Sequence, residues 1–415
     1  MMRIAIVGAG VSGLVAAHLL ARDHEIVVYE AGAHAGGHTN TVRVDTADET
    51  HQIDTGFIVF NDRNYPNFER LLNRLRVAWQ PSEMSFSVAD EHGAFEYNGA
   101  SPNGVFATRA LLRELWFHRM LTEIPRFQRA ARALLASDED GPSLSSWLEA
   151  QRFSAPFVER LIVPQAAAVW SADPCQMGSF PARFLAEFFD NHGMLSLLGR
   201  PRWRVVRGGS ARYVEALTRP FAHRIRLAAP VNEIRRGDDH VEVRARGQEA
   251  ERFDQVVIAS HSDQALAMLA DASAREHEIL GAIPYQRNQA VLHTDVRLLP
   301  RRRRAWASWN YHLLDEPQSR ATVTYHMNRL QSLRSRHEFL VTLNRSEAIE
   351  PVHVIKTFEY DHPVFTTGGI AAQRRIAEIS GQRRTHYCGA YWGFGFHEDG
   401  VASALRVAEA FGVAE

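Results

Sequence analysis

The 415-residue sequence predicts an α/β fold in which a doubly wound parallel-sheet domain is interrupted by an inserted domain. Three observations predict it. Residues 3–30 have the pattern of strand, glycine turn, helix and strand, strand-forming segments return over residues 225–260, and a glycine-rich stretch precedes a last helix. We therefore expect a discontinuous first domain over residues 1–75, 205–265 and 370–415. The inserted domain then covers residues 76–204 and 266–369, since 415 residues exceed one ordinary core.

The N-terminal unit has the pattern of a dinucleotide-binding turn. Gly8 permits the tight turn, Gly10 lets a pyrophosphate approach the backbone, and Gly13 lets helix and strand pack closely. Phosphates then meet free amides at the helix N-terminus, and an acidic residue at the end of the second strand accepts ribose hydroxyls. The alternative is a purely structural turn. The expected contacts are Gly8, Gly10, Val11, Ser12, Gly13, Glu30 and Ala31.

A second glycine pair indicates FAD rather than NAD. NAD domains usually need only the first loop, whereas a further pair beyond the acidic residue gives more amides for a long pyrophosphate. The segment Asp54-Thr55-Gly56-Phe57 follows it. The expected contacts of this part are Gly36, Gly37, His38, Thr55, Gly56 and Phe57.

These motifs together resemble the flavin-containing amine oxidoreductase superfamily. The resemblance implies a Rossmann-like FAD-binding domain of the amine oxidase or glutathione reductase type, with an inserted mixed-sheet and helical substrate domain. The family usually has an arginine after the glycine pair, where this chain has His38. Neither cysteine falls where the covalent-flavin members keep theirs, so the resemblance implies noncovalent FAD.

The family also ends with a strand, a glycine, an acidic residue and a helix whose N-terminal amides face the flavin. Here Gly389 ends the strand, Ala390 replaces the acidic residue, and we expect Gly400 and Val401 to open the helix. The strand beginning at Val231 resembles those that touch the adenine edge. The contacts implied by this part are Val231, Gly389, Trp392, Gly400 and Val401.

A narrower resemblance rests on longer strings. Residues 387–400, Asn191-His192-Gly193, Trp203 with residues 207–210, and residues 56–61 resemble a bacterial flavoprotein group. This group is related to the flavin domain fused to plant cyclopropane-fatty-acid synthases, and includes a desaturase of furan fatty acid synthesis. The resemblance implies a methyl-modified acyl chain as substrate and a lipid methyltransferase as a partner.

Four residues are candidates for catalysis. His192 and His397 titrate near neutrality and could transfer a proton, although each could also be a hydrogen-bonded structural histidine. Tyr391 could line an apolar pocket facing the flavin, or pack in the core. Lys356, the single lysine of the chain, could lie at the reactive flavin edge as in amine oxidases, or be a solvated strand residue.

Composition limits the partners and the compartment. The formal net charge of -1 gives no indication of nucleic-acid binding, and two distant cysteines fit a reducing compartment. No signal peptide or membrane span is evident, so we expect a cytoplasmic protein that needs no metal. The run Arg301-Arg302-Arg303-Arg304 beside Trp306 suits anionic headgroups, and could place the protein at the inner membrane, or be a solvated loop.

Three functions remain open from the sequence. The first is an FAD-dependent oxidoreductase that desaturates a lipid or methyl-modified acyl chain by hydride transfer to flavin. The second is a small-amine oxidase that releases hydrogen peroxide, which needs Lys356 near the flavin. The third is a noncatalytic accessory flavoprotein of a lipid methyltransferase.

Overall fold

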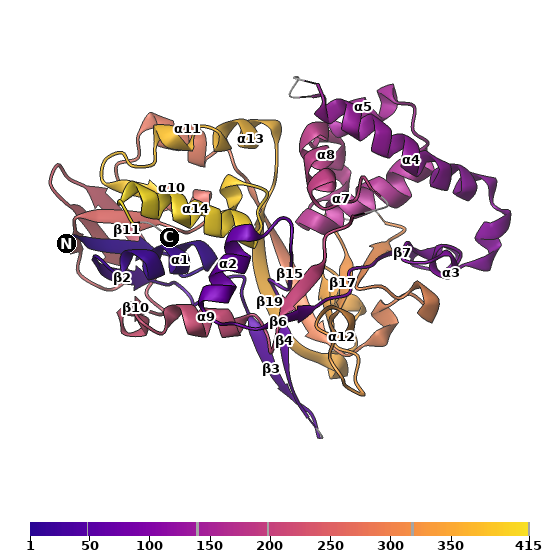
Figure 1. Ribbon diagram of the computed structural model, residues 1–415, viewed down its shortest axis with the longest axis horizontal. Coiled ribbons are helices and arrows are strands. Elements are labelled where there is room, and N and C mark those ends of the chain that lie inside the picture. Colours follow the sequence, from indigo (N-terminus) through magenta and orange to yellow (C-terminus); the bar gives the residue numbers. More distant parts are fainter. Residues whose placement is uncertain (48, 138–140, 197–198, 317–318, 414–415) are drawn as a thin grey trace.

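The computed structural model describes residues 1–47, 49–137, 141–196, 199–316 and 319–413. It has two lobes, with both chain termini in the lobe that holds the parallel sheet (Figure 1). Within the described ranges, no helix combines the length and apolar character that crossing a membrane requires.

The first lobe is built on a parallel sheet whose strands come from four distant parts of the chain. The order of strands across the sheet is β10-β2-β1-β14-β20. All of these strands fall within the predicted segments 1–75, 205–265 and 370–415. In sheet order they are β10 (Ile225–Arg226), β2 (Glu25–Tyr29), β1 (Arg3–Val7), β14 (Gln255–Ile258) and β20 (Thr385–Tyr387).

The two faces of this sheet carry different layers because successive side chains of a strand point in opposite directions. Ile4 and Ile6 pack with one set of helices, whereas Ala5 and Val7 pack with an antiparallel meander and further helices. The first layer holds α1 (Val11–Leu20), α2 (Pro66–Arg74), α9 (Ala211–Thr218) and α14 (His397–Ala410). The second holds β11 (Val231–Arg236), β12 (Val241–Ala245), β13 (Glu251–Phe253), α10 (Ser262–Met268), α11 (Ala274–Leu280) and α13 (Thr367–Gln373).

A buried ion pair ties the meander to α11 within the second layer. Arg236 is enclosed and pairs with Asp271 at 2.9 Å and with Glu276. The Tyr387 hydroxyl donates to Glu276 at 2.6 Å. Burial alone would raise the pKa of Glu276, but these hydrogen bonds lower it to about 2. Removing one partner would leave a buried charge uncompensated.

The second lobe contains a mixed sheet of order β19-β15-β18-β17-β16-β7-β8. Most of its pairs are antiparallel, but β16 pairs with β7 in parallel. Its strands are β7 (Phe86–Asp90), β8 (Glu96–Asn98), β15 (Tyr285–His293), β16 (Trp309–Leu313), β17 (Val323–His326), β18 (Leu340–Leu343) and β19 (Val354–Pro363). The sequence pattern does not predict β18, whose residues are all buried and therefore show no alternation.

Helices pack around this sheet. They are α3 (Pro102–Val105), α4 (Leu115–Leu135), α5 (Leu144–Ala150), α6 (Ala155–Phe157), α7 (Val163–Trp170), α8 (Ala182–Asn191) and α12 (Met327–Leu330). Of these, α4, α5, α7 and α8 form the upper right of Figure 1. A π-helical turn, η2 (Val158–Ile162), joins α6 to α7. Such turns are frequent at functional sites.

Short elements join the two lobes. The hairpin of β3 (Thr41–Asp45) and β4 (Thr50–Asp54) follows the second glycine pair. Strand β9 (Trp203–Val206) pairs with both β5 (Val59–Asn61) and β6 (Trp79–Pro81). Short 3-10 helices include η1 (Arg109–Arg113), η6 (Arg303–Ala305) and η10 (Ala390–Trp392).

Candidate active site

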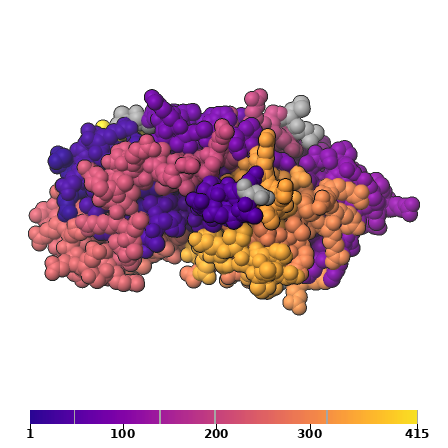
Figure 2. Space-filling model, turned by 90° about the horizontal axis from the view of Figure 1, so that it is seen from below, coloured from indigo at the N-terminus to yellow at the C-terminus, as the bar shows by residue number. Residues whose placement is uncertain are grey.

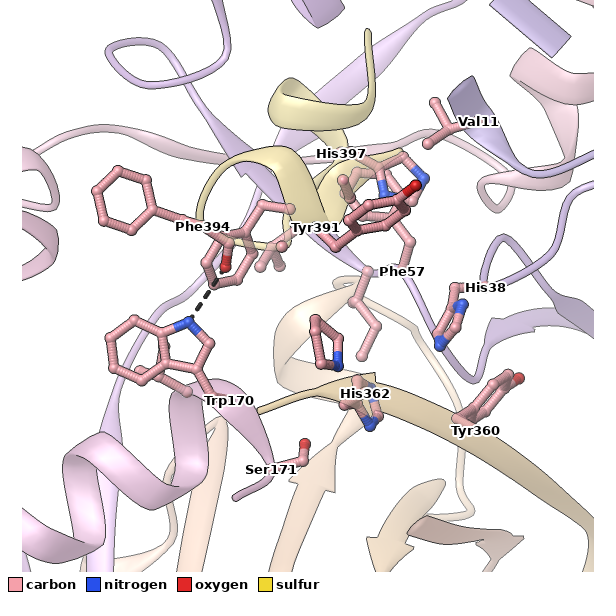
Figure 3. A pocket seen from close by; sticks show the side chains of 18 of the residues that line it. Val11, His38, Phe57, Trp170, Ser171, Tyr360, His362, Tyr391, Phe394 and His397 are labelled. Atoms are coloured by element: carbon pink, nitrogen blue, oxygen red, sulfur yellow. Dashed lines mark hydrogen bonds between the residues drawn. The ribbon is translucent and has the colours of Figure 1, made fainter. Parts of the chain in front are cut away.

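A cavity of about 1930 Å³ runs between the two lobes. One end lies at the C-terminal ends of β1, β2 and β14, where parallel α/β sheets bind their ligands. The other end lies among α4, α6, α7 and α8 of the second lobe. Figure 3 shows side chains from both lobes facing the same space.

The first glycine turn forms a close-packed cradle. Gly8 has φ +108°, which L side chains rarely adopt. A Cβ on Gly13 would lie 1.9 Å from the Gly8 carbonyl oxygen, so α1 packs against the turn only because Gly13 has no side chain. By contrast, a Cβ on Gly10 would have no atom within 4 Å. Because Gly10 lines the cavity, that free space is available to a ligand.

Glu30 ends β2 beside this turn and lines the cavity. One carboxylate oxygen accepts from the amide of Ala9 at 2.8 Å, and the other from the amide of Gly32 at 2.7 Å. These bonds hold the carboxylate in place and leave further lone pairs on both oxygens. The arrangement fits the hydroxyls of a ribose.

The second glycine pair closes the cradle from the opposite side. Gly36 and Gly37 both have positive φ, and Gly37 lies so close to Gly10 that a Cβ added to it would be 3.2 Å from the Gly10 Cα. A Cβ on Gly56 would lie 2.1 Å from the His38 carbonyl oxygen. The three segments therefore bring their backbones together around one narrow space, which fits a pyrophosphate.

Most of the predicted cofactor contacts line the cavity. They are Gly8, Gly10, Val11, Ser12, Glu30, Ala31, Gly36, Gly37, His38, Thr55, Gly56, Phe57, Val231 and Gly389. Gly13 does not line it, because it lies where α1 meets the turn.

Three predicted contacts at the C-terminal end are corrected by the structure. Helix α14 begins at His397, earlier than the expected opening at Gly400 and Val401, because the Asp399 carboxylate accepts from the Phe396 amide at 2.9 Å and caps it there. Gly400 instead lets α14 approach α1, since a Cβ there would lie 2.7 Å from Val11. Val401 and Trp392 are buried in the cores and do not line the cavity.

His192 lies in the cavity wall between two aromatic rings. It stacks on Phe188 at a centroid distance of 3.9 Å and on Trp203 at 5.8 Å. Its Nδ1 donates to the Phe188 carbonyl oxygen at 2.9 Å, which leaves Nε2 as the proton acceptor of the neutral ring. Burial lowers the pKa of His192 to about 4. His192 is therefore a neutral imidazole at neutral pH, and its lowered pKa makes it a weak proton acceptor.

His397 also lines the cavity, but its ring is engaged within the first lobe. Its Nε2 lies 2.9 Å from the Thr39 hydroxyl and 3.0 Å from the Tyr213 hydroxyl. The ring stacks on Phe57. These contacts fix the start of α14 against the second glycine segment, which gives His397 a positioning role.

The remaining two catalytic candidates differ in location. Tyr391 lines the cavity, and burial raises the pKa of its phenol well above the ordinary value, so it stays a neutral phenol at neutral pH. Lys356 is exposed on β19, lies over the Phe358 ring at 5.2 Å, and is absent from the cavity wall. The expectation that Lys356 lies at the reactive edge of the flavin is therefore wrong.

Three histidines converge in the cavity wall, and two of them were not predicted. The ring centroid of His38 lies 5.3 Å from that of His362 and 6.1 Å from that of His261. His38 stacks on Tyr360 at 5.1 Å, and Figure 3 shows His38, Tyr360 and His362 facing one space. We call His38, His261 and His362 the histidine cluster.

The histidine cluster is uncharged near neutral pH. Burial lowers the pKa of His38 to about 4 and that of His362 to about 3, and it also lowers the pKa of His261. The Asn288 amide donates to His362 Nδ1 at 2.9 Å, so the hydrogen of that ring is on Nε2. Among the described residues, no group of histidine, cysteine or acidic side chains is arranged to hold a metal ion. The histidine cluster therefore places neutral, polar imidazoles in the cavity wall beside Tyr360.

The part of the cavity within the second lobe is an apolar arm. Its side chains come from α4, α6, α7, α8 and the π-helical turn, far apart in the sequence. Among the described lining residues, those of this helical region include no Asp, Glu, Arg or Lys. The arm is lined by Met120, Leu121, Ile124, Phe127, Phe157, Leu161, Ile162, Val169, Phe188 and Phe189, together with the uncharged amides of Gln128 and Gln165.

Comparison with solved structures shows similar folds at low sequence identity. Cyclohexylamine oxidase from Brevibacterium oxydans IH-35A is 17% identical, with 99% of each chain covered and a TM-score of 0.70. A fatty acid isomerase from P. acnes that produces CLA is 16% identical, with 99% of this chain and 98% of that chain covered and a TM-score of 0.69. A putative protoporphyrinogen oxidase from Exiguobacterium sp. 255-15 is 17% identical over the same shares, with a TM-score of 0.69.

The family model described as flavin containing amine oxidoreductase matches residues 11–294. That range covers more than half of the chain and includes the second glycine segment, the helical region and β14. It agrees with the glycine cradle and the Glu30 carboxylate, which fit FAD. The chain is an FAD-dependent oxidoreductase and belongs to the flavin-containing amine oxidoreductase family.

Proposed function

We propose that the enzyme dehydrogenates the acyl chain of a lipid, most simply a methyl-modified one. The observation that carries this proposal is the apolar arm, which extends from the cradle into the helical region without an ionised side chain among its described residues. Apolar pockets with a few polar groups bind apolar ligands, and a chain in this arm would lie among Met120, Ile124 and Phe127. The resemblance to the bacterial flavoprotein group supports the same substrate class.

The residues of the chain would divide the chemistry as follows. The first-lobe cradle would hold FAD, which accepts a hydride when bound. Forming a carbon–carbon double bond also releases one proton from the neighbouring carbon, and a base must take it up. His192 is the candidate, since it lies in the cavity wall with Nδ1 donating to the Phe188 carbonyl oxygen and Nε2 without a hydrogen. Its lowered pKa means that it would pass the proton on rather than keep it.

Oxidation of small amines has less support. That alternative depended on Lys356 at the flavin edge, and Lys356 is exposed on β19. The cavity carboxylates of Glu359 and Asp361 are already paired with Arg287, at 3.4 and 3.3 Å. Amine oxidases among the structural neighbours share the fold at 16–17% identity, which does not extend to substrates.

The test is anaerobic reduction of the FAD-loaded protein. Phospholipids with methyl-branched acyl chains are added, and the absorbance near ~450 nm is followed, with unbranched phospholipids and small amines as parallel additions. The proposal predicts bleaching by acyl lipids and none by amines. Bleaching by amines alone would overturn it in favour of an amine oxidase. A flavin that cycles only when a lipid methyltransferase is added would favour the accessory function.

A further inference from the structure

The segment between α3 and α4 forms an exposed tip of the second lobe. In Figures 1 and 2 this purple segment lies at the end of the molecule remote from the N-terminus. Two large apolar side chains on it face solvent, Leu112 at 50% exposed and Leu115 at 84% exposed. Leu115 is the first residue of α4, the helix whose later turns line the apolar arm.

Arginines surround these leucines. Arg109 and Arg113 flank Leu112 and are both exposed. Arg109 donates to the Phe106 carbonyl oxygen and to Asn103, and neither partner is a carboxylate. The one acidic neighbour in this part of the sequence is Glu114, which accepts from the Trp116 indole at 3.0 Å.

Only part of the arginine run at residues 301–304 belongs to this exposed surface. Arg301 and Arg302 donate backbone amides to the buried carboxylate of Glu96, and Arg302 also pairs with it at 3.0 Å. Arg303 and Arg304 are exposed.

Contacts of η6 with the tip hold Arg303 and Arg304 beside it. The Arg304 guanidinium donates to the Ala107 carbonyl oxygen at 2.8 Å, which ties η6 to the segment between α3 and η1. The Arg303 guanidinium lies over the Trp306 ring at 5.3 Å.

The cavity reaches the surface beside this tip. Gly99 and Ala100 line the cavity and are exposed, and only Ser101 separates them from α3. Val105 at the end of α3 lines it as well. A chain that enters there would pass from α3 to the side chains of α4.

We propose that this tip docks on a bilayer that contains anionic lipids. Leu112 and Leu115 would enter the interface, and the cationic side chains of Arg109, Arg113 and Arg303 would meet the headgroups. This proposal rests on the proposed function in one respect: docking would give the lipid substrate of the enzyme a route from the membrane into the cavity. Docking itself does not require turnover, so the two can fail separately.

The experiment measures co-sedimentation of the FAD-loaded protein with vesicles. One set of vesicles is phosphatidylcholine alone, and the other contains about one third phosphatidylglycerol, which carries the anionic charge. The tip variants are Leu112→Asp/Leu115→Asp and Arg109→Gln/Arg113→Gln/Arg303→Gln. Matched controls on the first lobe are Leu227→Asp, which is 45% exposed in the wild type, and Arg22→Gln/Arg235→Gln/Arg252→Gln.

We expect the wild type and both controls to bind the anionic vesicles, with binding that weakens as salt is raised. Each arginine removed from the tip should weaken partitioning about fivefold, and the leucine pair at least about tenfold. An unchanged flavin spectrum and thermal midpoint would show that the variants are folded. Tip variants that bind like the wild type, or wild-type binding indifferent to phosphatidylglycerol, would overturn the proposal. Docking without any flavin bleaching by lipids would retain the docking surface and reject the substrate.

Discussion

The two ends of the cavity are built in different ways. At the cradle, the ligand meets backbone, and the packing depends on glycines a few residues apart, such as Gly8 and Gly13. At the apolar arm, the ligand would meet side chains from α4, the π-helical turn, α7 and α8, which the fold brings together. A backbone site constrains the sequence locally, whereas a side-chain cavity needs only apolar residues of suitable size. Cofactor binding can therefore be predicted from the sequence, whereas the choice of substrate cannot.

The first prediction separates packing from ligand contact within the cradle and has the largest effect. Gly13→Ala places a Cβ 1.9 Å from a carbonyl oxygen, so we expect it to destabilise folding by at least about 3 kcal/mol. Gly10→Ala has no protein atom within 4 Å, so it should fold normally but weaken FAD binding about tenfold or more. Urea unfolding of the apoprotein and FAD titration measure the two effects. Equal unfolding midpoints for the two variants would contradict this division.

The next largest effect is expected from filling the apolar arm. Ile124→Trp should lower the rate of flavin bleaching by acyl lipids by about 100-fold, because the indole occupies the space of the chain. Thr122→Trp is the matched control, since Thr122 lies on the same helix but is exposed. Stopped-flow absorbance gives both rates. Full activity of Ile124→Trp would place the substrate elsewhere.

The third prediction concerns pH and the neutral histidines. Burial lowers the pKa of His38 to about 4 and of His362 to about 3, below the ordinary value near 6.5. The unfolded chain therefore binds more protons between these values, and stability should fall as pH is lowered from 7 to 5, by at most about 2 kcal/mol for each histidine. His362→Phe should flatten this dependence in urea unfolding of the apoprotein.

Two groups act in the opposite direction and set the control for this measurement. Burial raises the pKa of both Asp54 and Asp399 to about 6, so each favours the folded state as pH falls toward 4. Asp54→Asn should therefore steepen the loss of stability on acidification that His362→Phe flattens. Parallel pH profiles for both variants would show that neither group titrates as described.

The smallest expected effect is that of Lys356→Met. Because Lys356 is exposed on β19 and outside the cavity wall, FAD binding and bleaching rates should stay within about twofold of the wild type. A large decrease in the rate of flavin bleaching would show that Lys356 acts in the active site after all.

Features that depend on local backbone constraints can be predicted from the sequence, whereas features that depend on contacts between distant residues cannot. The spacing from Gly8 to Glu30 predicts strand, turn, helix and strand because each glycine has a local reason to be there. Helix α14 starts before the predicted residues because its cap is a carboxylate, Asp399, inside the helix rather than a residue before it.

The histidine cluster could not be predicted because its three members lie more than 100 residues apart in the sequence. Only one signal could have found part of it. His261 follows the C-terminal end of β14, as Gly8 follows β1, and ligands bind at such strand ends. His362 has no local signal, because its place depends on the pairing of β19 with β15.

The cradle fits FAD, and we propose that an acyl chain occupies the apolar arm beside it. The most direct test is to titrate the FAD-loaded protein with fatty acyl ligands of increasing length and to follow the flavin absorbance spectrum. We expect each added methylene to tighten binding by up to about fourfold until the arm is filled, and Ile124→Trp to abolish this dependence. Affinities independent of chain length, or a spectrum that responds to amines but not to acyl ligands, would contradict it.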